Sequence, residues 1–300
     1  MVEKDQIILK FLEIPVPIGT AGAFIWALAY FLELWNPHEY SDFEVVFSIF
    51  WMRLYTLMVI LALFAYYVYM YVESLRVAIV HHNIRKEESK NRPPQNMILV
   101  PGGRFKFGLE GKDLFLDSFF IDKYLVTNEE YNEFINNTDY PPPKNWNNGS
   151  PPSDKLRHPV TCVNYKDALA FCRWRSDKIG FKIDLPTEEQ WEKAARGPFG
   201  YNYPWGKLFD PRRCNVGKGN SGLTNEVDSY PNGRSLYGCY DMCGNVWEWT
   251  KSCYDPENEI RVLKGGSYYF DQGFSSLWLR YNDPSKDAFK DLGFRCVHTI

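Results

Sequence analysis

Residues 54–72 (LYTLMVILALFAYYVYMYV) constrain this chain more than any other stretch, because they run without a single charged side chain. About 20 apolar residues are enough for a helix to cross the hydrocarbon core of a bilayer. The stretch therefore predicts a transmembrane helix. Residues 16–35 are also apolar, but they begin beside prolines and include Glu33. They predict a second transmembrane helix, with a re-entrant or interfacial helix as the alternative.

The charges around these two stretches predict their orientation. The connection between them, residues 36–46, contains acidic residues but no Lys or Arg, whereas five basic residues follow between positions 73 and 92. Cytoplasmic loops carry the excess of Lys and Arg. We therefore expect a helical hairpin in the inner or plasma membrane, multi-pass, with both termini and the soluble domain in the cytoplasm. If the first stretch does not cross, the amino terminus moves to the other side.

A change of composition after the apolar stretches predicts three regions. These are a membrane anchor (1–75), a charged linker (76–96) and a soluble domain (97–300). The linker begins as a continuation of the helix and ends in a charged segment with two prolines. In the soluble domain, short apolar runs alternate with Gly, Pro, Asn and Asp, which is typical of short strands joined by turns.

Capping residues predict three helices in the soluble domain. They lie within residues 128–137, 164–180 and 185–197. Thr187 caps the third helix, with Gln190 at the capping-box position, and glycines end the second and third. Little regular structure is expected in the roughly 100 residues that follow.

The overall composition excludes several classes of function. A net charge of −3 gives no reason to propose nucleic acid as a partner. The seven cysteines include no CxxC pair, so they predict neither a structural zinc nor a disulfide scaffold. Aromatic residues reach 17%, which favours a fold whose long loops are held by large buried rings.

The order of motifs in the soluble domain resembles that of the formylglycine-generating enzyme, or sulfatase-modifying factor, family. The motifs are MILVPGGRFKFG (97–108), FFIDKYLVTNEEYNEF (119–134), HPVTCVNYKDALAFCRW (158–174), LPTEEQWEKAARG (185–197), YPWG (203–206), DMCGNVWEW (241–249), RVLKGGSYY (261–269) and LGFRCV (292–297). The resemblance covers about two-thirds of the chain. It implies an α+β domain with a C-type-lectin-like core and long loops.

The same resemblance implies that the catalytic site is degenerate. Active enzymes of the family oxidise a cysteine of a sulfatase peptide to formylglycine, using two cysteines, copper and dioxygen. The matching positions here are Phe270 and Ser275, which do not supply the thiolates that select Cu(I). Ser267 matches an active-site serine, and Asp291 stands where active enzymes carry Asn. We therefore expect a pseudoenzyme that binds no copper.

The family has three other branches whose features can be compared with this sequence. One forms carbon–sulfur bonds with non-haem iron and needs a separate helical domain, whose place is taken here by membrane segments. The remaining two are non-catalytic ligand-binding proteins and membrane-associated accessory subunits, and the loss of the cysteines leaves both open.

The DMCGNVWEW run predicts a calcium site. In the family this loop binds calcium through positions that match Asp241, the carbonyl oxygens of Gly244 and Val246, and Glu248. Hard oxygen ligands of this kind suit calcium. The alternative is that Glu248 is only a buried hydrogen-bond acceptor. The family's other calcium loop lacks an Asp here (217–224), so we expect it to be weak or empty.

Cys172 and Cys296 match positions that form a disulfide in secreted relatives. For a cytoplasmic domain, two buried thiols are the expectation instead, because the cytoplasm keeps thiols reduced.

The favoured function is a membrane-anchored binding or scaffold protein, an accessory subunit of a larger integral membrane assembly such as a respiratory or photosynthetic complex. The first alternative is a receptor domain that recognises a protein or a small ligand through the vestigial active-site face. The second alternative is a metal-dependent oxidase. The residues expected on the recognition face are Tyr268, Tyr269, Phe270, Phe274, Trp278 and Tyr281.

Overall fold

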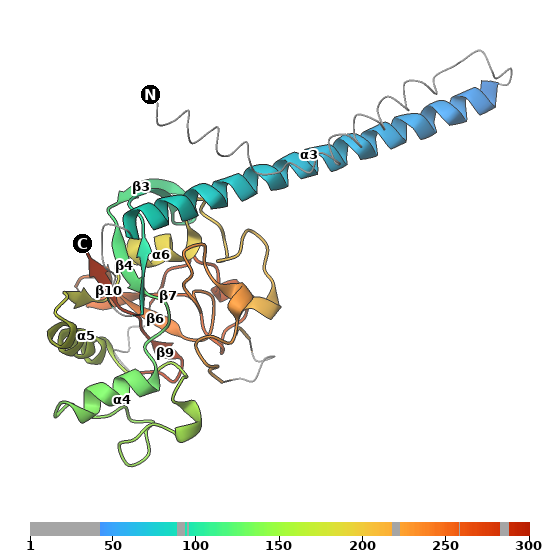
Figure 1. Cartoon of the computed structure of the whole chain (residues 1–300). Helices are drawn as coiled ribbons and strands as arrows, with labels where there is room; N and C mark the ends of the chain where they lie inside the picture. The colour runs from blue at the N-terminus through green and yellow to red at the C-terminus, as the bar shows by residue number, and fades with distance from the viewer. Residues whose placement is uncertain (1–42, 89–93, 95, 218–222, 258, 283–287) are drawn as a thin grey trace. The chain divides into compact units, whose positions relative to one another are not determined.

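The computed structural model describes residues 43–88, 94, 96–217, 223–257, 259–282 and 288–300. It divides into two compact units, 1–79 and 80–300. The longest element is helix α3 (Phe43–Glu88) of 46 residues (Figure 1). The predicted first membrane stretch, residues 16–35, lies outside the described residues.

Helix α3 contains the predicted membrane span at residues 54–72. Among the described helices, it is the one whose length and composition would let it cross a membrane: the candidate span is Trp51–Glu87, and an 18-residue window within it has a mean hydropathy of 1.8. The helix continues past the predicted anchor boundary at residue 75 to Glu88, in keeping with the expected helical start of the linker. Residues 76–88 contain no Gly or Pro, and the basic side chains of Arg85 and Lys86 in the last turn favour the helix terminus electrostatically. Much of the predicted linker is therefore helical.

Two four-stranded sheets form the centre of the second unit. In the first sheet, the strand order is β1-β4-β10-β5 with antiparallel pairs, and in the second it is β8-β7-β6-β9, where β6 and β9 run parallel. The strands of the first sheet are β1 (Met97–Val100), β4 (Phe119–Asp122), β5 (Ile183–Asp184) and β10 (Val297–Thr299). Those of the second are β6 (Trp247–Asp255), β7 (Ile260–Lys264), β8 (Tyr281–Asn282) and β9 (Leu292–Gly293). A separate hairpin pairs β2 (Gly103–Phe107) with β3 (Lys112–Leu116).

The three predicted helices are confirmed. They are α4 (Asn128–Asn136), α5 (Tyr165–Ile179) and α6 (Glu188–Arg196), and each begins with a capping box. Thr187 accepts a hydrogen bond from the Gln190 amide, as expected. Gly180 ends α5 with a φ of 72°, a conformation that glycine adopts without strain.

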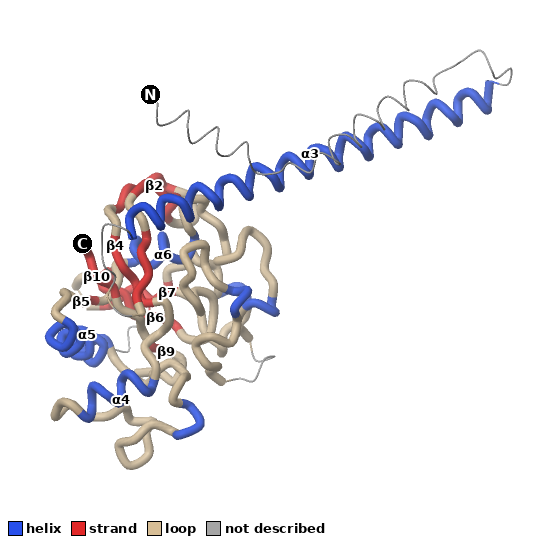
Figure 2. Tube along the Cα trace, viewed as in Figure 1, coloured by secondary structure: helices blue, strands red, loops and turns tan. Residues whose placement is uncertain are grey.

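Irregular chain dominates the region between α6 and the carboxyl terminus (Figure 2). It contains the short 3₁₀ turns η3 (Pro211–Arg213), η4 (Pro231–Gly233) and η5 (Gln272–Phe274), and η2 (Ser153–Lys155) lies before α5. The main core is correspondingly aromatic: the ring of Phe171 stacks on Tyr131 at 5.7 Å and meets Phe294 edge-on at 5.4 Å. The α+β class is as expected, and large rings supply much of the buried area.

Candidate functional site

The loop after β7 (residues 265–280) holds the positions that match the family's catalytic residues. It begins with two glycines whose φ values are 100° and 78°, in the region that side chains disfavour. A Cβ on Gly266 would lie 2.9 Å from the carbonyl oxygen of Phe274. The Gly-Gly pair therefore lets the loop fold back tightly on itself, which brings Ser267 and Ser275 to the inside.

Ser267 is fully buried and donates a hydrogen bond to Asp291 Oδ2 at 2.6 Å. Its oxygen also accepts from the Tyr269 amide at 3.3 Å. Asp291 comes from the segment just before β9, so the contact ties the loop to the end of the chain. A serine hydroxyl bonded to a carboxylate supplies no thiolate.

Phe270 occupies the first expected cysteine position, and its ring forms the centre of an aromatic cluster. Its ring centroid lies 5.7 Å from Trp247, 5.0 Å from Phe274 and 5.8 Å from Tyr281. The indole of Trp247 stacks on Tyr281 at 4.7 Å. The first predicted cysteine position is therefore occupied by a phenyl ring that packs among other aromatic rings.

Ser275 occupies the second position, where it is buried and donates to the carbonyl oxygen of Gln272 at 2.9 Å. It also lies in contact with the thiol of Cys243, which in turn contacts Cys214. Burial raises the pKa of the Cys243 thiol well above its usual value. A neutral thiol is a poor nucleophile and metal ligand. Sequence reasoning missed this neighbourhood because Cys243 lies in a different motif.

The predicted recognition face is smaller than expected. Tyr268 is only 8% exposed, and its amide donates to the carbonyl oxygen of Asn245, so it is not part of an exposed surface. Tyr269 and Phe274 are exposed, at 57% and 39%. The other three expected members, Phe270, Trp278 and Tyr281, are half-buried. The face is thus two exposed rings above the Phe270 cluster.

The residues of the predicted calcium loop do not form one ligand set. Both carboxylate oxygens of Glu248 accept from Arg295, at 2.7 Å from Nε and 2.9 Å from the terminal nitrogen, and both side chains are fully buried. The guanidinium group of Arg295 thus neutralises the carboxylate that a calcium ion would otherwise bind. Within the described residues, no group of three or more His, Cys, Asp or Glu side chains is placed to hold a metal ion. Gly244 has a φ of 85° and Val246 is buried in the loop between Asp241 and Glu248.

Asp241 is the member of that loop that still lacks a partner atom. Its side chain is buried, and its Oδ2 accepts no hydrogen bond in the described structure. Burial raises the pKa of this carboxyl group well above the usual value, opposed by Arg295 and reinforced by Glu248. Because Glu248 is already neutralised, the four predicted ligands do not fit calcium together. Calcium stays a prediction, and Asp241 is the residue that tests it.

We expect Asp241→Asn to raise the melting temperature in EGTA. The carboxyl group of Asp241 has a higher pKa in the folded than in the unfolded protein, where the pKa is about 4. Its contribution to stability is therefore fully present below about pH 4 and is lost as the pH rises through the folded-state pKa. At pH 7 the burial of this carboxyl group therefore costs stability that the burial of the neutral amide does not. Thermal unfolding at pH 5 and pH 7, with EGTA or calcium, measures the effect.

A lower melting temperature for the variant in EGTA would contradict this account. Calcium itself has a separate signature in the same experiment. If it binds here, calcium raises the melting temperature of the wild-type protein and leaves the variant unchanged, since a ligand that binds only the native state stabilises it.

Cys172 and Cys296 lie side by side as thiols, with 3.6 Å between their sulfur atoms. Cys172 belongs to α5 and Cys296 precedes β10. Burial raises the pKa of Cys296 well above its usual value, so the thiol stays neutral.

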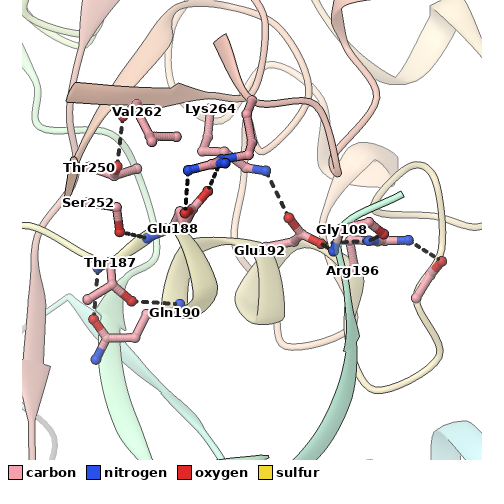
Figure 3. Close-up of polar contacts among 12 residues, drawn as sticks. Gly108, Thr187, Glu188, Gln190, Glu192, Arg196, Thr250, Ser252, Val262 and Lys264 are labelled. Atoms are coloured by element: carbon pink, nitrogen blue, oxygen red, sulfur yellow. Dashed lines mark hydrogen bonds and ion pairs between the residues drawn. The ribbon is translucent and has the colours of Figure 1, made fainter. Parts of the chain in front are cut away.

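A buried network of ion pairs joins α6 to Lys264, the residue at which the loop 265–280 begins (Figure 3). Glu192 accepts from Lys264 Nζ at 2.8 Å, from Arg196 at 2.6 Å and from the Gly108 amide at 2.6 Å. Glu192 and Lys264 are fully buried. Lys264 is the residue immediately before the two glycines. The sequence analysis did not predict this network. Glu192 and Lys264 lie in two separate motifs, and nothing local in either motif indicates that they pair.

A family model described as "Sulfatase-modifying factor enzyme 1-like domain" matches residues 83–300. The mouse protein named "Inactive C-alpha-formylglycine-generating enzyme 2" is 32% identical, over 67% of this chain and 85% of its own length. "Uncharacterized protein YfmG" of Bacillus subtilis is 31% identical over 71% of this chain, which spans 56% of that protein. The bovine "Formylglycine-generating enzyme" is 27% identical, over 68% of this chain and 75% of its own.

Solved structures show the same fold. PvdO from Pseudomonas aeruginosa superimposes with a TM-score of 0.57 at 25% identity, over 68% of this chain and 94% of the other. Relatives named as inactive and relatives named as enzymes both match, so the matches by themselves assign no catalytic state.

Proposed function

Because this chain belongs to the family of sulfatase-modifying factor enzyme 1-like domains, we propose that it is a non-catalytic, membrane-anchored member of that family. In this proposal it acts as a scaffold, an accessory subunit that stabilises a larger integral membrane assembly. The observation that carries the proposal is the Phe270 cluster, which fills the position where active relatives carry a cysteine.

The chemistry of the neighbouring side chains supports the loss of catalysis. Ser275 offers a neutral hydroxyl, and the nearest thiol, Cys243, is buried with a raised pKa. Cu(I) selects soft, deprotonated sulfur ligands, and neither group supplies one. A relative named as inactive is consistent with the same outcome in another member of the family.

The anchor rests on helix α3 and its apolar stretch. In this proposal the chain crosses the inner or plasma membrane twice, and its termini and soluble domain lie in the cytoplasm. The basic residues that follow residue 72 support that orientation. Reporter fusions at the two termini test it, because a reporter that is active only outside the cytoplasm should stay silent at both.

Purification of the full-length protein from native membranes in a mild detergent tests the scaffold role. We expect a stoichiometric set of integral membrane proteins to accompany it, and mass spectrometry identifies them. An accessory subunit should stay bound because permanent assemblies bury large interfaces. Recovery of the protein alone would contradict the proposal.

The alternative function is recognition of a protein or small ligand through the exposed rings of Tyr269 and Phe274. Aromatic side chains of this kind are enriched at interfaces. Tyr269→Ala with Phe274→Ala separates the two functions, with Leu109→Ala as a control at another exposed apolar side chain. Loss of a partner only in the double variant favours recognition. Oxidation of a cysteine peptide by copper-treated wild-type protein would instead revive the oxidase.

A further inference from the structure

The carboxyl-terminal end of α3 lines a cavity of ≈ 610 Å³ together with two loops of the soluble domain. Its basic lining residues are His81, Arg85, Arg213 and Arg234, and its aromatic ones are Trp205 and Tyr237. No Asp or Glu is among the described residues that line it. The volume falls in the range of small-molecule sites. The cavity plays no part in the vestigial active site.

The positive charge of this cavity is only partly compensated. Arg213 Nε lies 3.2 Å from Asp210, but the same carboxylate is held by two bonds from Arg212, each of 2.9 Å. Arg234 Nε donates to a backbone carbonyl, that of Pro231, at 2.8 Å. In the described part of the chain, neither Arg234 nor Arg85 forms an ion pair with a carboxylate. Two guanidinium groups thus remain available to an anion.

The chemistry of the lining selects a phosphate group. Guanidinium groups present planar pairs of donors that match phosphate oxygens bidentately. The guanidinium of Arg213 lies over the Trp205 ring at 6.0 Å and that of Arg234 over Tyr240 at 5.6 Å, which orients both groups. A free phosphate ion would leave much of the ≈ 610 Å³ empty, whereas a larger phosphate ester fills more of it.

The position of the cavity along α3 indicates where that ester comes from. Arg53 is the last charged residue before the apolar stretch, and His81 follows it by 28 residues. At 1.5 Å per residue this is about 42 Å of helix. A bilayer with its headgroup layers measures about 40–45 Å. If Arg53 lies at one headgroup layer, His81 reaches the other, where basic residues beside a membrane helix attract anionic lipids.

We propose that this cavity binds the phosphate-bearing headgroup of an anionic phospholipid. The inference rests on the membrane anchoring of the proposed function. Bound lipid would tie the soluble domain to the membrane surface through Arg85 and Arg234.

Native mass spectrometry of the full-length protein, with phosphatidylglycerol or phosphatidylcholine added to the detergent, tests the site. We expect the wild-type protein to retain phosphatidylglycerol preferentially. Arg85→Gln with Arg234→Gln should weaken that binding about tenfold, roughly 1.4 kcal/mol. The control is Arg104→Gln with Arg173→Gln, which removes the same charge from exposed positions outside the cavity. Arg85→Lys with Arg234→Lys should restore only part of the preference for the anionic lipid, because lysine keeps the charge but not the bidentate geometry.

Equal retention of the two lipids, or an equal loss in the control variant, would overturn the proposal. So would displacement of the lipid by an equal concentration of inorganic phosphate or glycerol phosphate, which would make a soluble anion the ligand. Alkaline carbonate extraction tests membrane anchoring separately from lipid binding in the cavity. Release of the protein from membranes refutes the anchor itself, whereas a retained protein without lipid preference refutes only the cavity assignment.

Discussion

Arg295→Met is expected to lower the free energy of unfolding by about 3–5 kcal/mol, because it leaves a buried carboxylate without its partner. Arg295 is fully buried and forms two bonds to Glu248, and it also donates to the carbonyl oxygens of Tyr240 and Asp122. The methionine side chain fills similar space but replaces none of these donors. Urea denaturation followed by tryptophan fluorescence, with the protein in detergent, measures the loss.

Two variants make this result interpretable. Arg280→Met removes an arginine whose side chain is 46% exposed, so we expect a smaller loss than for the fully buried Arg295. Glu248→Gln combined with Arg295→Met removes both charges, so it should recover part of the loss. If Arg295→Met destabilises no more than the Arg280 control, Glu248 has another cation, and the calcium reading of the loop regains its main ligand.

The helices of the soluble domain could be predicted because their signals are local. Thr187, Gln190 and Gly180 act within a few residues of the helix ends that they define. The order of motifs also predicts that Phe270 and Ser275 occupy the positions of the family's catalytic cysteines, and this correspondence stays a prediction. The fold then followed from the family rather than from periodicity, as the second sheet includes two strands of only two residues.

The contacts that decide the site could not be predicted, because they join distant parts of the chain. Glu248 and Arg295 are 47 residues apart in sequence, and their pairing depends on the parallel contact of β6 with β9. Tyr268 was expected on an exposed face, yet its side chain is only 8% exposed and its amide donates to the carbonyl oxygen of Asn245. The continuation of α3 into the linker, by contrast, could be expected, because no Gly or Pro lies between Val72 and Pro93.

Glu192→Gln is expected to cost about 3–5 kcal/mol and to loosen the loop that carries the vestigial site. The substitution removes the carboxylate that pairs with both Lys264 and Arg196, and it leaves two cations at positions that are 0% and 4% exposed. Burial already lowers the pKa of Lys264, and Glu192 opposes that effect. Without the carboxylate, the ammonium group is an unpaired buried charge, which is strongly destabilising.

The matched control lies one helical turn away on α6. Glu188→Gln makes the same chemical change at a buried carboxylate whose partner, Arg280, is 46% exposed, so we expect a smaller loss than for Glu192→Gln. Lys264 directly precedes Gly265, so Glu192→Gln should also speed amide exchange in residues 265–280, and Glu188→Gln should not. Equal exchange in the two variants would mean that the glycines and the Phe270 cluster hold the loop by themselves. Faster exchange only in Glu192→Gln would show that the buried charges of Glu192 and Lys264 help to hold residues 265–280 rigid.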